Sequence, residues 1–294
     1  MQAVLGNKRV ILLLLAPALI VYTLIMLIPV LWSLGYMFFS GSPLTGFHYT
    51  GLANITHLFH DPEAGSALLF TLKYAIVITI GQVIVGYGLA LLYVFVLRKS
   101  SNIVRTLIFF PIVLPTVAVA ELFQKVFAIA PQLGLVNALL HAMGLTPVDW
   151  FGSAGTAFLV LAIMDIWRSM GFYGVLLYAG LLEIPEDVLE AARIDGANSW
   201  HLTRRVILPL SLPVLLSSFI FSINGTLKVF DSVIALTNGG PGTSTTPLTL
   251  YMFQTSFTYG SYGYGATIAT LLSLLCLVAT LFIFVSTRRD LRKA

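Results

Sequence analysis

The sequence predicts an all-α membrane protein, one that crosses the bilayer with about six helices. Of its 294 residues, 58% are hydrophobic and only 10% are charged, whereas soluble domains carry roughly 25% charged residues. Several apolar runs reach the about 20 residues that a transmembrane helix needs. An outer-membrane barrel would instead show alternating segments of about ten residues, and the runs here are long and continuous. A soluble domain and a membrane barrel are therefore both excluded.

Six apolar segments follow one another along the chain. They cover about residues 10–34, 68–97, 106–127, 155–180, 210–236 and 263–286. The first is too long for the core of a signal peptide and no small-residue cleavage site ends it, so we expect an uncleaved span. Pro17 and Pro29 are expected to kink that span, which a membrane helix tolerates when neighbours satisfy the freed backbone groups. Gly81, Gly86 and Gly88 in the second span favour close helix packing.

The polar segments divide the chain into three parts. An N-terminal part, residues 1–66, holds the first span and an outer loop. The core follows over residues 67–286 and contains one long polar stretch, residues 183–209. A basic tail, residues 287–294, ends the chain.

Basic residues orient the chain, because cytoplasmic loops carry an excess of Lys and Arg. With the N-terminus inside, the cytoplasmic segments hold twelve of the sixteen: Lys8, Arg9, Arg98, Lys99, Arg105, Arg193, Arg204, Arg205, Arg288, Arg289, Arg292 and Lys293. The other four, Lys73, Lys125, Arg168 and Lys228, lie within spans or at their ends. We therefore expect both termini and the polar stretch 183–209 in the cytoplasm.

The segment from Glu190 to Pro209, EAARIDGANSWHLTRRVILP, lies between two spans and must sit in water against a membrane face. Pro185 fits the first position of a helix. Gly196 is a good terminator of that helix, since glycine adopts the left-handed conformation cheaply. Asn198 or Ser199 can cap a second helix. A helix, a turn and a second helix are therefore expected.

Within this segment, EAA at residues 190–192 is followed by Gly196, Val206 and Leu208-Pro209. The pattern resembles the cytoplasmic signature of bacterial ABC importer permeases, with Val206 in place of the family's usual Ile. Asp195-Gly196-Ala197 is similar to the form common in sugar importers. In that family the loop docks into a cleft on a separate ATPase subunit. The resemblance implies that the coupling residues are Glu190, Ala191, Ala192, Asp195, Gly196, Ala197, Leu208 and Pro209.

Charged residues inside two spans need an explanation, because a charge at mid-helix costs about 2.5–3.5 kcal/mol on insertion scales. Asp165 and Arg168 lie three residues apart, as do Lys228 and Asp231. Each acid could neutralise its neighbour on the same helix face. Alternatively, these groups line a watery pathway, together with the nearby amide and aromatic ring. The candidate pathway residues are Asn224, Lys228, Phe230, Asp231, Asp165 and Arg168.

Lys228-Val229-Phe230-Asp231, followed by Leu236-Thr237-Asn238-Gly239-Gly240-Pro241, carries a second resemblance. It looks like the fifth-span and outer-loop pattern of maltose-type carbohydrate ABC permeases, which commonly have Gly where this chain has Asn238. The resemblance implies a first-permease-like subunit with a type I ABC importer transmembrane fold and a di- or oligosaccharide substrate. Polar groups for sugar hydroxyls and an aromatic ring for sugar C–H faces are both present.

Several kinds of site are missing from the sequence. No Gly-x-x-x-x-Gly-Lys-Ser/Thr occurs, so we expect no ATP site and no enzyme activity in this chain. His57 and His60 lack further metal ligands nearby, and we expect neither a metal nor a cofactor. The net charge of +4 is spread over short loops and does not indicate nucleic acid binding.

The resemblance covers about residues 10–286 and implies a multi-subunit importer in the bacterial cytoplasmic membrane. Its expected partners are a second homologous permease, two ATPase subunits that hold ATP and Mg, an extracytoplasmic sugar-binding protein, and membrane lipid. An ABC importer of glycerol phosphate or another solute remains open, since Lys228 could serve a phosphate. So does an ion-coupled carrier with Asp165, Asp231 and Glu121 as relay, although each has a basic neighbour that would hold it ionised. A membrane scaffold would leave the EAA pattern and the buried charges unexplained.

Overall fold

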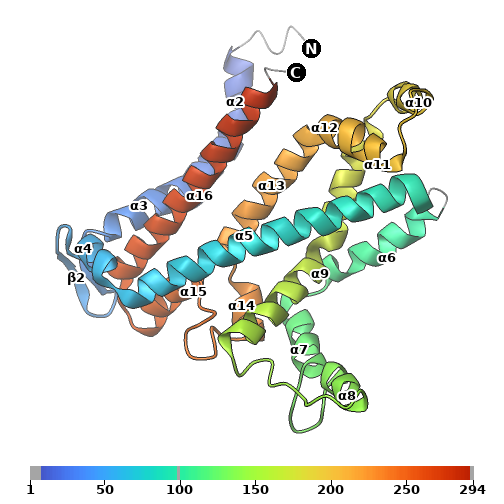
Figure 1. Cartoon of the computed structure of the whole chain (residues 1–294). Coiled ribbons are helices and arrows are strands. Elements are labelled where there is room, and N and C mark those ends of the chain that lie inside the picture. The colour runs from blue at the N-terminus through green and yellow to red at the C-terminus, as the bar shows by residue number, and fades with distance from the viewer. Residues whose placement is uncertain (1–7, 98–99, 292–294) are drawn as a thin grey trace. The chain divides into compact units, whose positions relative to one another are not determined.

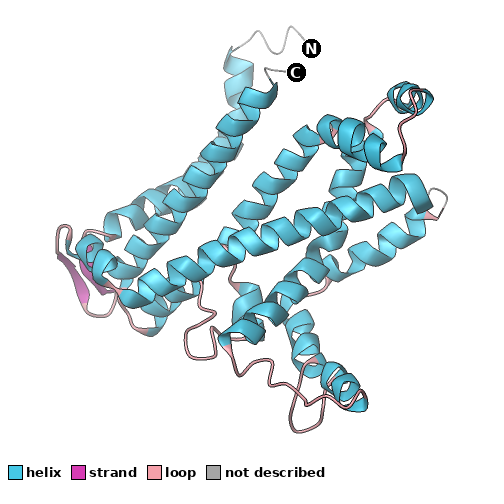
Figure 2. Cartoon of the chain, viewed as in Figure 1, coloured by secondary structure: helices cyan, strands magenta, loops and turns pink. Residues whose placement is uncertain are grey.

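The computed structural model of this chain describes residues 8–97 and 100–291, and it is built almost entirely of helices (Figures 1 and 2). The predicted all-α class is confirmed. In the described residues the strands are β1, Phe39–Ser42, and β2, Gly46–Tyr49, which pair antiparallel as a hairpin with Phe39 opposite Tyr49. The predicted basic residues Arg98 and Lys99 and the last three residues of the predicted tail lie outside the described residues.

The predicted number of spans agrees with the structure. In the described part of the chain, four helices are long and apolar enough to cross a membrane, and two bent helix pairs raise the possible total to six. The four are Val10–Tyr36, Pro62–Leu97, Ala154–Leu182 and Tyr262–Phe284. The two bent pairs are Ser101–Val113 with Thr116–Val126 and Ser199–Leu210 with Leu212–Leu227.

The chain divides into two compact units, the first of which combines residues up to Pro62 with Met252–Leu271. Its elements are α2 (Lys8–Tyr22), a π-helical turn (Thr23–Leu27), α3 (Ile28–Tyr36), the hairpin, α4 (Ala53–His60), a second π-helical turn (Gln254–Thr258) and the start of α16 (Tyr262–Leu291). Asn54 on α4 donates hydrogen bonds to the Met37 and Phe39 carbonyls at 3.0 and 2.8 Å. The Tyr264 hydroxyl on α16 donates to the Asp61 carboxylate. The segment between α3 and α5, expected to be an outer loop, is therefore ordered by its amide and carboxylate side chains.

A π-helical turn precedes a proline at two places in the chain. Thr23–Leu27 comes just before Pro29, and Thr203–Ile207 just before Pro209. A proline ring clashes with the carbonyl four residues earlier, and in both cases that carbonyl lies inside the wider π turn. The helix thus passes the proline without ending.

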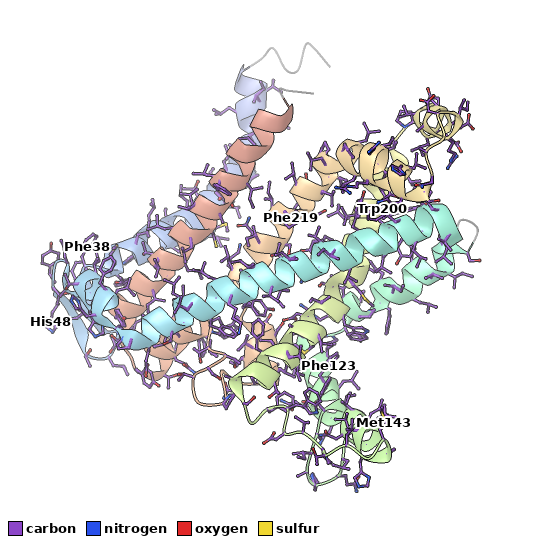
Figure 3. The ribbon with its side chains drawn as sticks, viewed as in Figure 1. Phe38, His48, Phe123, Met143, Trp200 and Phe219 are labelled. Atoms are coloured by element: carbon purple, nitrogen blue, oxygen red, sulfur yellow. The ribbon has the colours of Figure 1, made fainter. Side chains whose placement is uncertain are left out.

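The second unit comprises Glu63–Tyr251 and the chain from Leu272. Its elements are α5 (Pro62–Leu91), a π-helical turn (Leu92–Leu97), α6 (Ser101–Val113), α7 (Thr116–Val126), α8 (Leu135–Ala142), α9 (Ala154–Leu182), α10 (Glu186–Ile194), α11 (Ser199–Leu202), a further π-helical turn (Thr203–Ile207), α12 (Leu208–Leu210), α13 (Leu212–Leu227), α14 (Asp231–Leu236) and α15 (Leu248–Phe253). α9 packs against α6, α7, α13 and α14. Phe123 of α7, labelled in Figure 3, contacts Trp167 of α9 with ring centroids 5.6 Å apart.

Glycine brings α5 and α9 together. A Cβ on Gly86 would lie 2.6 Å from the Tyr173 Cβ, and one on Gly81 would overlap the Ile166 side chain. The predicted close packing is confirmed at these two positions. It is wrong at Gly88, because nothing lies within 4 Å of the place where its Cβ would be.

The third predicted span is not one straight helix. α6 and α7 meet at an angle of 97°. Leu114 between them is extended, with φ −68° and ψ 143°, because the residue before a proline is pushed away from the helical region. Pro115 therefore breaks the segment that the hydropathy pattern shows as continuous.

The fifth predicted span, residues 210–236, is also interrupted. α12 and α13 meet at a bend of 67°. At its other end α13 stops at Leu227, and the chain runs through Lys228–Phe230 before α14 begins at Asp231. The predicted charged pair thus flanks a break in the helix rather than lying on one helix face.

The chain between α14 and α16 is buried in its middle part. Thr245, Thr246, Leu248 and Leu250 are buried, and the Leu248 amide donates to the Thr71 hydroxyl of α5 at 2.9 Å. This part is buried because the apolar side chains of α15 pack into the core. Threonine hydroxyls form hydrogen bonds with the backbone groups that are buried with them.

Candidate functional site

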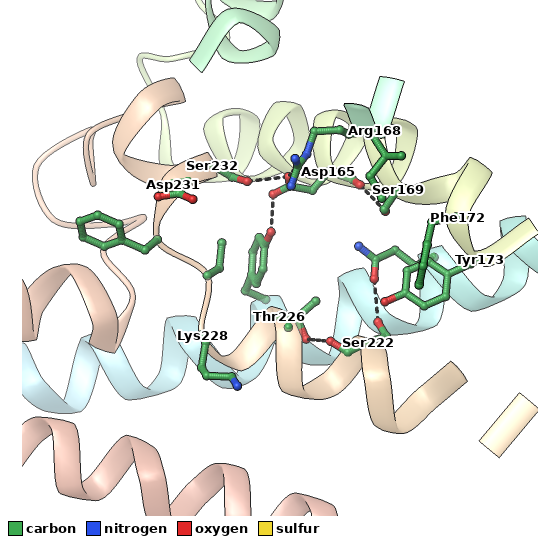
Figure 4. A pocket seen from close by; sticks show the side chains of 16 residues that line it. Asp165, Arg168, Ser169, Phe172, Tyr173, Ser222, Thr226, Lys228, Asp231 and Ser232 are labelled. Carbon is green, nitrogen blue, oxygen red and sulfur yellow. Dashed lines mark hydrogen bonds and ion pairs between the residues drawn. The ribbon is translucent and has the colours of Figure 1, made fainter. Parts of the chain in front are cut away.

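A cavity of about 340 Å³ lies in the second unit, between α5, the end of α6, α9, α13 and α14 (Figure 4). Five of the six predicted pathway residues line it: Asp165, Arg168, Lys228, Phe230 and Asp231. Further lining residues supply hydroxyls, an amide and three aromatic rings: Tyr74, Gln82, Ser169, Phe172, Tyr173, Ser222, Thr226 and Ser232. The cavity therefore offers donors, acceptors and ring faces at membrane depth.

The helix break after α13 forms part of the cavity wall. Lys228 caps the C-terminus of α13, and Phe230, with φ −142° and ψ −60°, has left the helical conformation. Irregular backbone at membrane depth is tolerated only where it is buried in protein or lines a water-filled cavity. The break at Lys228–Phe230 satisfies this condition because those residues line the cavity.

Lys228 and Asp231 do not neutralise each other. Both residues are exposed, they form no ion pair with each other, and Figure 4 shows their side chains pointing to opposite sides of the chain. The three-residue spacing would place them together only on an uninterrupted helix. The break removes that relationship, so both charged groups remain available at the cavity.

Asp165 behaves differently and joins three helices. It is only 5% exposed, and its carboxylate accepts hydrogen bonds from the Tyr74 hydroxyl of α5 and, at 2.7 Å, from the Ser232 hydroxyl of α14. Arg168 lies one turn away on α9, with its Nε 3.9 Å from an Asp165 oxygen. Asp165 and Arg168 therefore form the ion pair that one of the two interpretations expected, but with a long distance between the charged groups.

Arg168 connects α9 to α7, the second helix of the third predicted span. One of its terminal nitrogens donates to the Thr116 hydroxyl of α7 at 3.1 Å. Its Nε is buried and has no hydrogen-bond partner among the described residues. Arg168 therefore retains donor capacity beside the cavity while Asp165 is already satisfied.

A group of uncharged polar side chains, which the sequence motifs did not identify, links α5 to α13. The Ser222 hydroxyl donates to the Gln82 oxygen at 2.6 Å and lies 3.0 Å from the Thr79 hydroxyl. Thr226 lies 3.1 Å from Thr79. The usable signal was spacing, since Thr79 and Gln82 on one helix, and Ser222 and Thr226 on the other, each share a face.

Asn224 is the one predicted pathway residue that does not line the cavity. Its amide nitrogen donates to the Thr280 hydroxyl of α16 at 3.0 Å and to the Ile220 carbonyl at 2.9 Å. On α13 it therefore faces away from Ser222 and Thr226, which lie on the cavity side.

The segment with the EAA pattern folds as a helix, a turn and a second helix, as predicted. α10 begins at Glu186, so Pro185 is its N-cap residue, one position earlier than predicted. Gly196 has φ +85°, and the amides of Gly196 and Ala197 donate to the carbonyls of Arg193 and Ala192, both at 3.0 Å. This is the Schellman arrangement that a C-terminal glycine permits.

The second helix of this segment is capped by Asn198, which settles the choice between Asn198 and Ser199. The Asn198 side-chain oxygen accepts from the His201 amide at 2.9 Å. Ala192 and Ala197 pack against an apolar cluster of the unit. In contrast, Ile194 and Trp200 are 86% and 67% exposed.

The remaining predicted coupling residues are spread over two places. Glu190, Ala191, Asp195 and Gly196 are exposed on α10 and its C-terminal turn. Leu208 and Pro209 are also exposed but lie on α12, at the start of the bent segment. An exposed helix that carries apolar side chains is typical of a surface that another protein covers.

Metal chemistry has no support in the described residues, where no group of three or more His, Cys, Asp or Glu side chains could hold an ion. His57 instead packs edge-on against the Tyr264 ring, with centroids 4.5 Å apart.

Comparison with known proteins identifies the family to which this chain belongs. Residues 82–290 match the family described as binding-protein-dependent transport system inner membrane component. The chain is 32% identical over 279 residues to the probable ABC transporter permease protein YurN of Bacillus subtilis, covering 94% of each. It is 33% identical over 233 residues to the trehalose/maltose transport system permease protein MalF of Thermococcus litoralis, covering 79% of this chain and 78% of that one. The lactose transport system permease protein LacF of Rhizobium radiobacter is 32% identical over 282 residues, with 93% and 92% covered.

The fold is shared with a solved structure. A chain of a bacterial ABC transporter involved in the import of the acidic polysaccharide alginate superposes with a TM-score of 0.85 over 98% of this chain and 99% of that one, at 23% identity. A second structure of an alginate ABC transporter, in complex with an alginate pentasaccharide-bound periplasmic protein, gives a TM-score of 0.83 over 95% and 94%.

Proposed function

Because this chain belongs to the family of binding-protein-dependent transport system inner membrane components, we propose that it is the permease subunit of an ATP-driven sugar importer. The cavity around Lys228 and Asp231 contacts the sugar. The segment around α10 contacts a separate ATPase subunit. The chain itself carries the solute and supplies no ATP site.

One observation carries this proposal: two of the helices that line the cavity, α9 and α13, are the helices that flank the segment around α10. α9 contributes Asp165 and Arg168 to the cavity and ends at Leu182, shortly before α10. α13 contributes Ser222 and Thr226 and is reached from α10 through α11 and α12. A displacement of α10 by an ATPase therefore moves both cavity walls, and access to the cavity changes with it.

The substrate class is supported by the cavity and by the relatives. Lys228 and Asp231 offer charge-assisted hydrogen bonds to hydroxyl groups, and Phe172, Tyr173 and Phe230 offer ring faces. The similar proteins include transport permeases for trehalose and maltose, lactose, starch degradation products and sulfoquinovosyl glycerol. A sugar or glycoside is the class common to both observations. Glycerol phosphate is the second candidate, favoured only by the two cationic side chains.

The remaining parts of the importer follow from the proposal. A second homologous permease completes the pathway, two ATPase subunits bind ATP and Mg, and an extracytoplasmic sugar-binding protein delivers the substrate. The periplasmic protein bound to the similar alginate transporter supports the last of these. The membrane is the bacterial cytoplasmic membrane, with α10 and both termini on the cytoplasmic side.

The test begins with purification of the tagged chain from its own membrane in mild detergent and identification of the co-purifying subunits by mass spectrometry. The complex is then reconstituted in proteoliposomes, with ATP on the side of α10 and the sugar-loaded binding protein on the other. Uptake that requires both is expected. Recovery of the chain alone, with uptake driven by a proton gradient, would replace this proposal with an ion-coupled carrier.

A further inference from the structure

α8 presents an outer face made only of apolar residues. The exposed apolar positions on α8 are Leu135, Ala138, Leu139, Ala142 and, at its C-cap, Met143. Leu135, Leu139 and Met143 are 62%, 57% and 73% exposed. These positions follow one another at three- and four-residue spacing and thus form one stripe along the helix.

The opposite face of α8 holds the helix in place through a polar side chain. Asn137 is fully buried. Its side-chain nitrogen donates to the carbonyls of Ala128 and Val148, both at 3.0 Å, and its oxygen accepts from the Val148 amide at 2.9 Å and from the Trp150 indole at 3.2 Å. Every side-chain donor and acceptor of this buried amide group is engaged. The orientation of α8 is therefore fixed, with its apolar stripe outward.

A helix that is held through its inner face and has an apolar outer face does not suit water. Apolar surface left in water costs roughly 25 cal/mol per Å², and none of the described residues of the chain covers the stripe on α8. We propose that α8 lies in the plane of the membrane interface, with Leu135, Leu139 and Met143 inserted among the acyl chains at the boundary with the lipid headgroups.

The charge pattern favours lipid over a protein partner. Residues 126–148 contain no Asp, Glu, Lys or Arg, whereas protein docking surfaces have a polar rim around their apolar centre. The only ionisable side chain on α8 is His141, which lies off the stripe. A surface of this kind matches the acyl region just below the headgroups.

The position of α8 along the chain agrees with an interfacial location. α7 is the second helix of a bent apolar pair, and its last two turns expose Glu121 and Lys125. Charged side chains of this kind lie at the ends of spans, near the headgroups. α8 begins ten residues after Lys125. Amphipathic helices at this depth lie parallel to the membrane. On the orientation proposed above, the leaflet is the outer one.

The experiment places a polarity-sensitive fluorophore on α8 of the full chain within its purified complex. Cys276, the single cysteine, is first replaced in Cys276→Ser. Leu139→Cys then reports the stripe, and His141→Cys is the matched control, being exposed on the same helix but off the stripe. Both are labelled in nanodiscs of phosphatidylethanolamine and phosphatidylglycerol, and quenching is compared between a lipid with a nitroxide near the headgroup and aqueous iodide.

An interfacial α8 gives several-fold stronger quenching of Leu139→Cys than of His141→Cys by the nitroxide lipid, and the reverse order with iodide. Equal iodide quenching at both sites would show the stripe in water and overturn the proposal. Protection of Leu139→Cys from both quenchers would also overturn it, since a protein subunit would then cover the stripe. ATP hydrolysis stimulated by the sugar-loaded binding protein is measured in the same nanodiscs, so an inactive importer is recognised separately.

Discussion

The hydroxyl of Tyr74 on α5 donates a hydrogen bond to the buried carboxylate of Asp165 on α9. Ser232 on α14 binds the other carboxylate oxygen at 2.7 Å. Asp165 thereby ties together three helices of the cavity wall, and through Arg168 it reaches α7 as well. Substrate access can change only if these helices move together or if these bonds are exchanged for others.

The Tyr74 bond should contribute measurably to stability. Tyr74→Phe removes one hydrogen bond to a buried charged group, and we expect a loss of about 1.5–3 kcal/mol in the free energy of unfolding. Tyr87→Phe is the control, because the Tyr87 hydroxyl shares a 3.0 Å hydrogen bond with the neutral Ser211 hydroxyl. That loss should be about 0.5–1.5 kcal/mol. Thermal unfolding of the purified complex measures both, and equal losses would mean that Asp165 is not ionised there.

Lys228 and Asp231 should matter for transport and not for folding. Both are exposed and unpaired with each other, and surface substitutions usually change stability by less than about 0.5 kcal/mol. If each binds the sugar by a charge-assisted hydrogen bond of about 1.5–3 kcal/mol, Lys228→Ala or Asp231→Ala should weaken transport by roughly 10–100-fold. Uptake kinetics in proteoliposomes give the answer.

Asn224→Ala supplies the contrast for that measurement. Asn224 binds Thr280 of α16 and does not line the cavity. Its loss should lower the melting temperature of the complex while the sugar concentration at half-maximal uptake stays unchanged. Normal uptake by Lys228→Ala and Asp231→Ala, with a defect in Asn224→Ala, would place the sugar elsewhere.

Hydropathy predicted the number and order of the spans because it depends on run length, which the bilayer sets. It could not predict the breaks at Pro115 and Lys228–Phe230, since both lie inside runs that remain apolar on average. Proline marked the first break without indicating its angle. The second has no proline, and its signal was the cost of Lys228 and Asp231 at membrane depth.

Local motifs predicted the segment around α10 well, because capping depends on a few neighbouring residues. Gly196 adopts the left-handed conformation that ends α10, and Asn198 caps the second helix. It was harder to predict which neighbour each side of a helix would face. Asn224 and Thr226 are two residues apart on α13, yet one faces α16 and the other the cavity, and only the packing of neighbouring helices decides which.

Gly196 should be required for coupling to the ATPase. Its φ of +85° is outside the range of proline, which is fixed near −65°, so Gly196→Pro should disrupt the turn after α10. We expect a loss of most of the ATP hydrolysis that the sugar-loaded binding protein stimulates. Gly196→Asn is the control, since asparagine tolerates the left-handed region and nothing lies within 4 Å of the added Cβ. Full stimulation in Gly196→Pro would remove α10 from the coupling path.

Two glycines two residues apart on α5, Gly86 and Gly88, should respond in opposite ways to the same substitution. A Cβ on Gly86 would lie 2.6 Å from the Tyr173 Cβ and 3.0 Å from its carbonyl carbon, so Gly86→Ala must push α9 away from α5, and overpacking of this kind costs about 1–3 kcal/mol. Gly88 has no neighbour within 4 Å, and Gly88→Ala should instead stabilise α5 by roughly 0.5–1 kcal/mol, because alanine loses less backbone entropy in a helix. Paired melting curves of the two variants in one detergent test this. Destabilisation of similar size in both would mean that α5 needs glycine for flexibility and not for its contact with Tyr173.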